Sequence, residues 1–122
     1  VRFKETQFAN DPNSDTMMGV PVSPGTVTAP ASLINSPAEF DQMRPGTILV
    51  CPQTNPAWTP LFAHAAGLVT DMGGILGHGS IVAREYGIPA VVGTGTSTQR
   101  IKHGQMISVD GDVGTVKLLE DE

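Results

Sequence analysis

Cysteine and aromatic side chains are scarce in this sequence, and no long apolar run is present. The single cysteine, Cys51, has no partner for an internal disulfide, and aromatic residues make up 5% of the 122 positions. No stretch reaches the roughly 18 consecutive apolar residues of a membrane-spanning helix, and no signal peptide is visible at the N-terminus. We therefore expect a cytoplasmic chain in which Cys51 is a small buried hydrophobe without a catalytic thiol role.

Positive charge is in short supply as well. Lys and Arg number 7 against 12 Asp and Glu, which gives a formal net charge of −5. This balance provides no basic stripe for nucleic acid or for an anionic membrane. The 3 His and 1 Cys stand at no metal-ligand spacing. We therefore expect this domain to have no nucleic-acid, membrane or metal partner.

Glycine and proline, by contrast, are plentiful, with 14 Gly and 10 Pro. This composition is typical of a turn-rich α/β domain packed with small aliphatic side chains. Residues 1–17 hold a cluster of turn formers and no sustained period, so we expect a linker or flexible N-terminus there. Residues 18–120 then form one domain, which is long enough for a single core.

Short apolar runs bounded by turn formers predict the elements of the central part of the chain. A fully buried strand is expected over 47–50, and further strands are expected over 68–70 and 90–92. Helices are expected between them, over 60–66 with an end at Gly67 and over 80–86. Because strands and helices alternate, parallel strand pairing is favoured.

The flanking segments have a different pattern. A strand over 27–34 is expected to break at Pro30, and a capping box that begins at Ser36 predicts a short helix. Near the C-terminus, two strands within residues 106–118 flank a Gly-rich turn and predict an antiparallel hairpin. The chain therefore combines a parallel unit with a separate antiparallel layer.

The run from Gly73 to Glu85 is the most informative part of the chain. It reads GGILGHGSIVARE, and His78 stands between glycines where a loop turns into a helix. Glycines let the backbone approach a ligand closely, and the unpaired N–H groups of a helix N-terminus favour an anion. The same field disfavours an imidazolium, so we expect a neutral imidazole, which is a nucleophile. The run therefore predicts a phosphate site that contains its own nucleophile.

The same residues resemble a known family. The segments that carry the resemblance are Thr70–Gly74, His78, Ile81–Glu85 and Gly87–Gly93, with Ser23–Gly25 and Val109–Gly111 near the two ends. They resemble the phosphohistidine swivelling (mobile) domain of the phosphoenolpyruvate-utilising enzymes, such as pyruvate phosphate dikinase, phosphoenolpyruvate synthase, enzyme I of the sugar phosphotransferase system and rifampicin phosphotransferase. The resemblance implies an α/β fold of three β/β/α layers, with a central mainly parallel sheet, a smaller antiparallel layer and short helices.

The resemblance implies roles for particular residues. In this family a histidine takes a phosphoryl group at an ATP-binding domain, the whole domain pivots, and the group is delivered at a distant second site. His78 falls on that histidine, Arg84 on an arginine six residues later, and Thr59 on an upstream threonine that contacts the phosphohistidine. Further phosphate-supporting residues are expected in the loop and at the helix start: Gly73, Gly74, Gly77, Gly79 and Ser80.

The resemblance also implies partners. An ATP-grasp-type nucleotide-binding domain would bring ATP and Mg²⁺, and a separate acceptor domain would receive the phosphoryl group, in the same chain or another. This domain would bind no cofactor itself and would not turn over alone. The commonest family pattern has Thr or Ser two residues before the histidine, where this chain has Leu76. Leu76 with Gly79 resembles the rifampicin phosphotransferase branch, so the expected acceptor is either pyruvate/phosphoenolpyruvate or a small-molecule hydroxyl.

Other interpretations of the same residues stay open at this point. A glycine loop also suits a non-catalytic swivelling or docking module, in which His78 is one hydrogen-bond donor to an anion or a partner. Thr59 could cap the following helix, and Arg84 could be a solvated helix residue. Structural or solvent-facing positions are expected for the other ionisable residues of interest: Asp71, His64 and His103.

Overall fold

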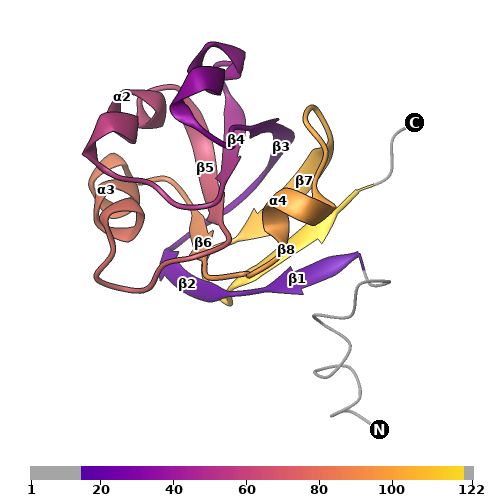
Figure 1. Ribbon diagram of the computed structural model, residues 1–122. Coiled ribbons are helices and arrows are strands. Elements are labelled where there is room, and N and C mark those ends of the chain that lie inside the picture. Colours follow the sequence, from indigo (N-terminus) through magenta and orange to yellow (C-terminus); the bar gives the residue numbers. More distant parts are fainter. Residues whose placement is uncertain (1–14, 120–122) are drawn as a thin grey trace, which may run out of the picture.

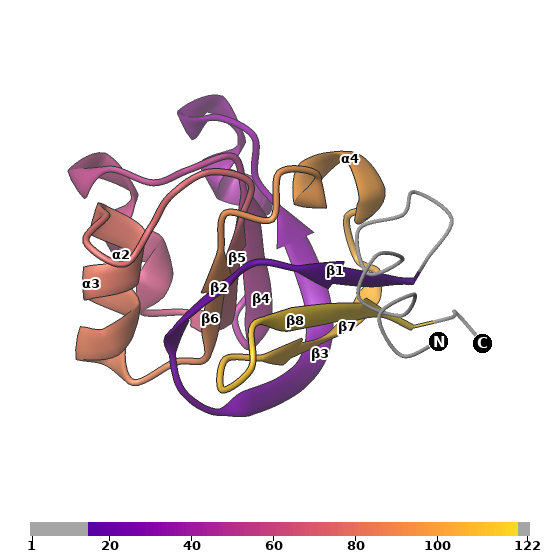
Figure 2. The ribbon, with the colours of Figure 1, turned by 90° about the horizontal axis from the view of Figure 1, so that it is seen from below.

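The protein folds in three layers, which Figure 1 shows side by side. The structure is a computed structural model that describes residues 15–119. Two helices, α2 (Thr59–Phe62) and α3 (His78–Tyr86), cover one face of a central sheet. A second, antiparallel sheet lies on the opposite side, as the view from below in Figure 2 also shows. The predicted α/β class, with parallel and antiparallel strands and short helices, is confirmed.

The central sheet consists of five strands. They are β2 (Val20–Ser23), β3 (Thr26–Leu33), β4 (Thr47–Cys51), β5 (Ala65–Thr70) and β6 (Ala90–Val92). The order is β3-β4-β5-β6-β2, in which β3 to β6 pair in parallel and β2 is antiparallel to β6. Every residue of β4 and β6 is buried because layers cover both faces of the sheet.

The antiparallel sheet shares strand β3 with the central one. Its other strands are β1 (Thr16–Met18), β7 (Met106–Asp110) and β8 (Thr115–Leu118), in the order β1-β8-β7-β3. The first part of β3 pairs with β7 as far as Pro30, and the next residues pair with β4. The predicted break at Pro30 is therefore wrong. Pro30 ends the pairing with β7, so a proline without an N–H is tolerated where the strand changes partners.

Three short helical segments lie in the connections that follow β3, β4 and β6. They are η1 (Pro37–Gln42), η2 (Pro56–Trp58) and α4 (Ser97–Arg100), of which η1 and η2 are 3₁₀ turns. The predicted capping box is not formed: Ser36 makes no side-chain cap bond, and Glu39 accepts instead from the N–H of Asn35, the residue before the N-cap, at 2.8 Å. Among the described residues, no helix is long and apolar enough to cross a membrane.

The helix predicted over 60–66 is shorter than expected. Helix α2 ends at Phe62, and β5 already begins at Ala65, so that Gly67 lies inside a strand. A Cβ at Gly67 would stand 3.0 Å from a methyl carbon of Val27 and 3.2 Å from the Pro89 carbonyl oxygen. Glycine at this position therefore allows two neighbouring segments to approach the strand and does not mark a helix end.

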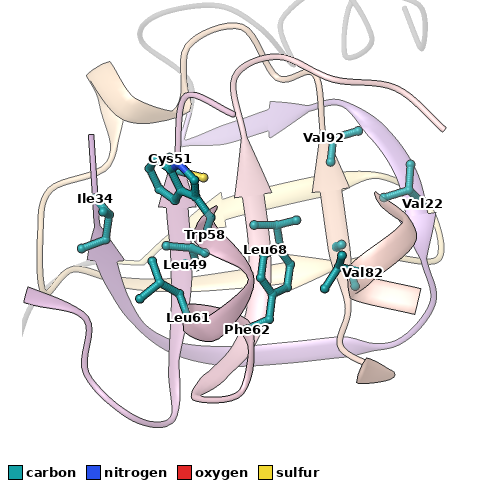
Figure 3. Packing of buried hydrophobic residues seen from close by; sticks show 12 residues of the cluster. Val22, Ile34, Leu49, Cys51, Trp58, Leu61, Phe62, Leu68, Val82 and Val92 are labelled. Atoms are coloured by element: carbon teal, nitrogen blue, oxygen red, sulfur yellow. The ribbon is translucent and has the colours of Figure 1, made fainter. Parts of the chain in front are cut away.

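Alternate side chains of the central strands fill two separate cores. Leu49 and Cys51 point toward the helices, where Figure 3 shows them with Phe62 and Leu68. Ile48 and Val50 of the same strand point to the other face and pack between the two sheets. Successive side chains of β4 point to opposite faces of the sheet, so this one strand contributes to both cores. The helices pack on one face and the antiparallel sheet packs on the other.

Strand β1 begins inside the segment predicted to be a linker. Thr16 pairs with Lys117 of β8, and the side chain of Met17 is completely buried between the sheets. Residues 1–14 of the predicted linker, and the last residue of the predicted domain, lie outside the described residues. The described fold thus starts two residues before the predicted domain boundary at 18.

We expect Cys51 to be unreactive in the folded protein. Its side chain is completely buried, and this burial, with a smaller contribution from the Asp71 carboxylate, raises the pKa of the thiol well above its ordinary value. A thiol-specific disulfide reagent at pH 8 should modify the native chain at least about tenfold more slowly than the chain in denaturant. The prediction that Cys51 is a small buried hydrophobe is confirmed. Equal rates of thiol modification in the native and the denatured chain would contradict the expected protection.

The raised thiol pKa also sets the direction of a pH effect. The protonated thiol is favoured in the folded state, so its contribution to stability is complete below the ordinary thiol pKa of about 8.5 and is lost progressively above it. In denaturant unfolding at a series of alkaline pH values, the free energy of unfolding should therefore decline with rising pH, and it should decline less in Cys51→Ala than in the native chain. An identical decline in both chains would contradict this assignment.

Candidate phosphate site around His78

Helix α3 begins at the histidine itself. Strand β5 ends at Thr70, a loop follows, and Gly77 is the extended N-cap residue of the helix that runs from His78 to Tyr86. Gly87 ends the helix in the left-handed conformation, with φ 70°. The helix therefore starts two residues earlier than predicted and ends where predicted. His78 lies in the first turn, whose N–H groups have no acceptor within the helix.

The imidazole of His78 lies between two threonine hydroxyls. Thr54 Oγ1 is 2.9 Å from Nδ1, and Thr59 Oγ1 is 3.2 Å from Nε2. The ring is half-buried and meets the ring of Phe62 edge to face, with centroids 6.1 Å apart. Each ring nitrogen thus has a hydroxyl within hydrogen-bond distance, and these two contacts restrain the orientation of the imidazole.

The sequence analysis predicted one of these two threonines and missed the other. The structure brings the predicted residue, Thr59, to the ring, and Asn55 rather than Thr59 caps the turn before α2, by accepting from the Ala57 N–H at 2.9 Å. Thr54 was not predicted. One sequence signal could have found it, because Thr54 follows the end of strand β4. Strand β4 pairs in parallel with β5, and side chains that follow neighbouring parallel strands meet at the same edge of a sheet.

Two hydrogen bonds to one carbonyl oxygen close the glycine loop before α3. The Ser80 hydroxyl donates to the Gly74 carbonyl oxygen at 2.6 Å, and the Gly77 N–H donates to the same oxygen at 3.0 Å. Gly73 has φ 128°, a conformation that disfavours any other residue. Gly79 is buried against Thr54. The predicted glycines and Ser80 therefore shape the loop and the helix start, and Ser80 does so through a backbone oxygen.

A cavity of about 100 Å³ opens beside the ring. Since a water molecule occupies about 30 Å³ in the liquid, only a group the size of a few waters can enter. Its walls come from the segment after β4, the end of β5, the glycine loop and the first turn of α3: Gln53, Thr54, Thr70, Met72, Gly73, Gly77, His78, Gly79, Ser80 and Val92. His78 is the one ionisable side chain among them, so backbone N–H groups and hydroxyls provide most of the polarity.

Arg84, which was predicted to support the phosphate, has a different set of contacts. Its guanidinium donates to the Val22 carbonyl oxygen at 3.0 Å and to the Ile75 carbonyl oxygen at 3.1 Å. These bonds tie the glycine loop to strand β2. The structure therefore brings Arg84 to the backbone of the loop and not to the imidazole.

Asp71 holds the start of the same loop. Its carboxylate accepts hydrogen bonds from the hydroxyls of Ser97 and Thr98 and from the Thr98 N–H, the last at 2.9 Å. The loop is thereby attached to helix α4. Asp71 thus has contacts that hold the loop in place, in agreement with the structural role predicted for it.

The remaining histidines lie elsewhere. His64 is exposed after helix α2, and its carbonyl oxygen accepts from the Gly46 N–H at 2.8 Å. His103 is exposed in the turn before β7, and its Nδ1 accepts from the Leu33 N–H at 3.0 Å. Both positions agree with the predicted structural or solvent-facing roles.

The loop that leads to His78 exposes apolar side chains. Met72 is 58% exposed, Ile75 59% and Leu76 84%. Leu76 stands where the commonest family pattern has a hydroxyl, and its exposure shows that it makes no packing contribution to the core. No formally charged side chain occurs between Met72 and Ala83, so the surface around the ring is nearly neutral.

The three-layer fold and the histidine at the start of α3 define the class of protein as a mobile domain of the kind that the sequence resembles. The family described as "PEP-utilising enzyme, mobile domain" matches residues 43–114. The chain belongs to this family, which confirms the resemblance drawn from the residues around His78.

Several relatives of this chain are phosphotransferases by name. It is 48% identical over 103 residues to an uncharacterized phosphotransferase of Bacillus subtilis (strain 168), a match that covers 84% of this chain and 12% of that protein. It is 47% identical over 110 residues to rifampicin phosphotransferase of Streptomyces sviceus, with 90% of this chain and 13% of that protein covered. The chain therefore spans a small part of the length of these relatives.

A solved structure supports the same family. The solution structure of an Enzyme I protein is 33% identical to this chain and has a TM-score of 0.58. The match covers 68% of this chain and 34% of that protein. The likeness thus extends from the sequence to the fold.

The glycine loop offers a test with a matched control. Gly73→Ala places a Cβ on a residue with φ 128° and should lower the free energy of unfolding by about 1–3 kcal/mol. Gly74→Ala is the control, because no atom lies within 4 Å of its new Cβ, and it should change stability by less than about 0.5 kcal/mol. Denaturant unfolding measures both, and equal effects would show that the backbone conformation of Gly73 is not a constraint.

Proposed function

We propose that this chain is a phosphocarrier domain: His78 is transiently phosphorylated from an ATP-derived donor on a partner domain and passes the group to a second site. One observation carries the proposal. The imidazole stands at the first position of α3, half-buried, with a hydroxyl 2.9 Å from one nitrogen and 3.2 Å from the other. A nucleophile fixed in orientation at a helix N-terminus suits the transfer of an anionic group.

The proposed transfer has two balanced steps. A lone pair of one ring nitrogen attacks the phosphorus of the nucleotide, the N–P bond forms, and the P–O bond to the leaving nucleotide breaks with its electron pair on that oxygen. In the second step, an oxygen of the acceptor attacks the phosphorus, the N–P electrons return to the ring nitrogen, and the acceptor loses its proton to solvent if it is a hydroxyl. Positioning and charge neutralisation are the main requirements of such chemistry.

The electrostatics of the site divide these requirements between this domain and its partners. The N-terminus of α3 favours the phosphoryl group by about 0.3–1 kcal/mol in an exposed setting, and up to about 2 kcal/mol when partly buried. No formally charged side chain lies between Met72 and Ala83, and the Arg84 guanidinium donates to backbone oxygens. The cations that neutralise the phosphates, Mg²⁺ included, are therefore assigned to the partner domains, and this domain alone would not turn over.

The length of the relatives supports partners within one larger protein. The chain covers 12% and 13% of the two relatives described above, which leaves room in them for several further domains. We assign ATP to an ATP-grasp-type domain and the choice of acceptor, pyruvate or a small-molecule hydroxyl, to a separate acceptor domain. An ATP-derived donor is in keeping with a cytoplasmic reaction.

Phosphate labelling tests the proposal. The chain is incubated with Mg-ATP, radiolabelled at the β- or the γ-phosphate, and with its ATP-binding partner domain. Native chain should acquire an acid-labile, alkali-stable phosphate, and His78→Gln should acquire none, because the nucleophile is missing. His64→Gln is the matched control, since His64 is exposed and outside the site, and it should label like the native chain.

The same experiment separates the competing function. If a partner that is shown to be active leaves the native chain unlabelled, the chain is a non-catalytic swivelling or docking module and the phosphocarrier proposal is wrong. Label that persists in His78→Gln would also contradict the proposal, because the phosphate would then sit on another residue.

A further inference from the structure

A second cavity lies apart from His78. It has a volume of about 620 Å³, and its described walls come from the end of α4, the turn before β7, the end of β8 and the residue before β1. Figure 2 shows α4 and β1 on the side of the molecule away from α2 and α3. Small-molecule sites typically have volumes of about 300–1,000 Å³, so a whole small molecule fits here. The two cavities share no described lining residue.

The described lining of this second cavity is positively charged on balance. Arg100 is the last residue of α4, and Lys102 follows it in the turn. Asp15 is the only acidic residue of that lining, and its carboxylate accepts from the neighbouring Thr16 hydroxyl at 3.3 Å. The whole chain has a formal net charge of −5. The positive charge at this cavity therefore runs against the charge of the chain, and it favours an anionic ligand.

Two neutral side chains add N–H donors to the same cavity. His103 Nδ1 accepts from the Leu33 N–H at 3.0 Å, so the proton of the imidazole is on Nε2, which is a donor. Gln105 Oε1 accepts from the Lys102 N–H at 3.0 Å, so the amide nitrogen of Gln105 remains to donate. Together with the guanidinium of Arg100 and the ammonium of Lys102, four side chains of the lining thus provide donors.

Backbone hydrogen bonds hold the turn that carries these donors. The Gly104 N–H donates to the Ala31 carbonyl oxygen of β3 at 2.8 Å, and the Gln105 N–H donates to the Lys102 carbonyl oxygen at 3.0 Å. Gly104 has φ 87°, a left-handed conformation that glycine adopts without strain. The turn is therefore fixed to the sheet before a ligand arrives, which lowers the entropic cost of binding.

The cavity also has an apolar part. Leu118 and Leu119, both half-buried, line it at the end of β8. The Leu118 N–H donates to the Asp15 carbonyl oxygen at 2.6 Å, and the Leu119 N–H donates to the Met106 carbonyl oxygen at 3.0 Å, so their backbone is fixed. A ligand that fills the cavity therefore meets cations, N–H donors and apolar carbon atoms, which suits a molecule with an anionic group and an apolar group.

We propose that this cavity binds a small organic phosphate, whose oxygens accept from Arg100, Lys102 and the two neutral donors and whose apolar part packs against the leucines. A phosphate monoester carries about −1.5 to −2 charges at pH 7 and has three terminal oxygens. Two cations and two neutral donors match this group better than they match a carboxylate, which has one charge and two oxygens. Asp15 then accepts from a hydroxyl or ammonium group of the ligand.

The cavity lies where the chain enters and leaves the described fold. Asp15 and Leu119, the first and last described residues, both line it. A bound phosphate would therefore lie beside both of these positions. Binding at this cavity is independent of the proposed function, because no described residue of the cavity beside His78 takes part in it.

Titration of the full chain with butyl phosphate tests the proposal. Backbone amide signals in ¹H–¹⁵N spectra should shift for His103, Gln105 and Leu119 and approach saturation, whereas those of Gly77 and Gly79 should not move. Inorganic phosphate should bind about fivefold or more weakly, because it does not reach the leucines. Butyrate should also bind about fivefold or more weakly, because it offers less charge and fewer oxygens to the same donors.

Two lysines provide a matched pair of variants. Lys102→Gln removes a charge from the cavity and should weaken the binding of butyl phosphate about tenfold or more, because a hydrogen bond between charged groups is lost. Lys117→Gln removes the same charge from an exposed residue of β8 that does not line the cavity. This control should change the affinity by less than about twofold, since distant surface charges are screened by salt.

Other outcomes would overturn the proposal. Equal weakening in the two lysine variants would show that the probe responds to the overall charge and not to the cavity. Shifts of Gly77 and Gly79 in place of His103 would locate the probe at the N-terminus of α3. Butyrate that binds as tightly as butyl phosphate would show that the site does not select a phosphate.

The acidic run Glu120–Glu122, which follows Leu119 in the sequence, is a competing source of anionic groups. The combined variant Glu120→Gln, Asp121→Asn, Glu122→Gln should bind butyl phosphate within about twofold of the native chain if the cavity takes a separate phosphate. If butyl phosphate binds only to this combined variant, the carboxylates of the chain itself occupy the cavity and the proposal is wrong.

Discussion

The site depends on one close contact, between the first turn of α3 and the segment that follows β4. Because Gly79 has no side chain, the helix start can lie directly against Thr54 and Leu68. The unpaired N–H groups of the helix, a threonine hydroxyl and the imidazole of His78 therefore share one small region beside the cavity. A side chain at this position would separate the helix from the edge of the sheet and remove the arrangement.

The loop before the helix is stiffened by bonds to backbone atoms. Ser80 donates to the Gly74 oxygen, Arg84 donates to the oxygens of Val22 and Ile75, and Asp71 accepts from α4. Polar side chains near the site are thus used to hold the backbone, and they leave little net charge beside the ring. Under the proposed phosphocarrier role, a nearly neutral site favours release of the phosphoryl group, because a fixed cation would favour its retention.

Sequence patterns predicted the elements whose local signal agrees with their environment. Strands β4 and β6 follow from uninterrupted apolar runs, and α3 ends where Gly87 permits the left-handed conformation. The predictions were wrong where tertiary contacts override a local signal. Gly67 resembles a helix end but lies in a strand because Val27 and Pro89 approach its backbone, and Pro30 is tolerated because β3 changes partners there.

By itself, the sequence determined which residue is the candidate nucleophile, because a histidine between glycines at a helix start needs no distant contact to be recognised. It also determined the glycine positions and the family, since these depend on local backbone conformation and on one contiguous motif. Only the tertiary structure decided the partners of the ring. Thr54 lies 24 residues from His78, and the parallel pairing of β4 with β5 brings the two together, while the direction of the Arg84 side chain depends on strand β2. Contacts between separate elements follow from strand register and the approach of backbones, which no single segment of the chain encodes.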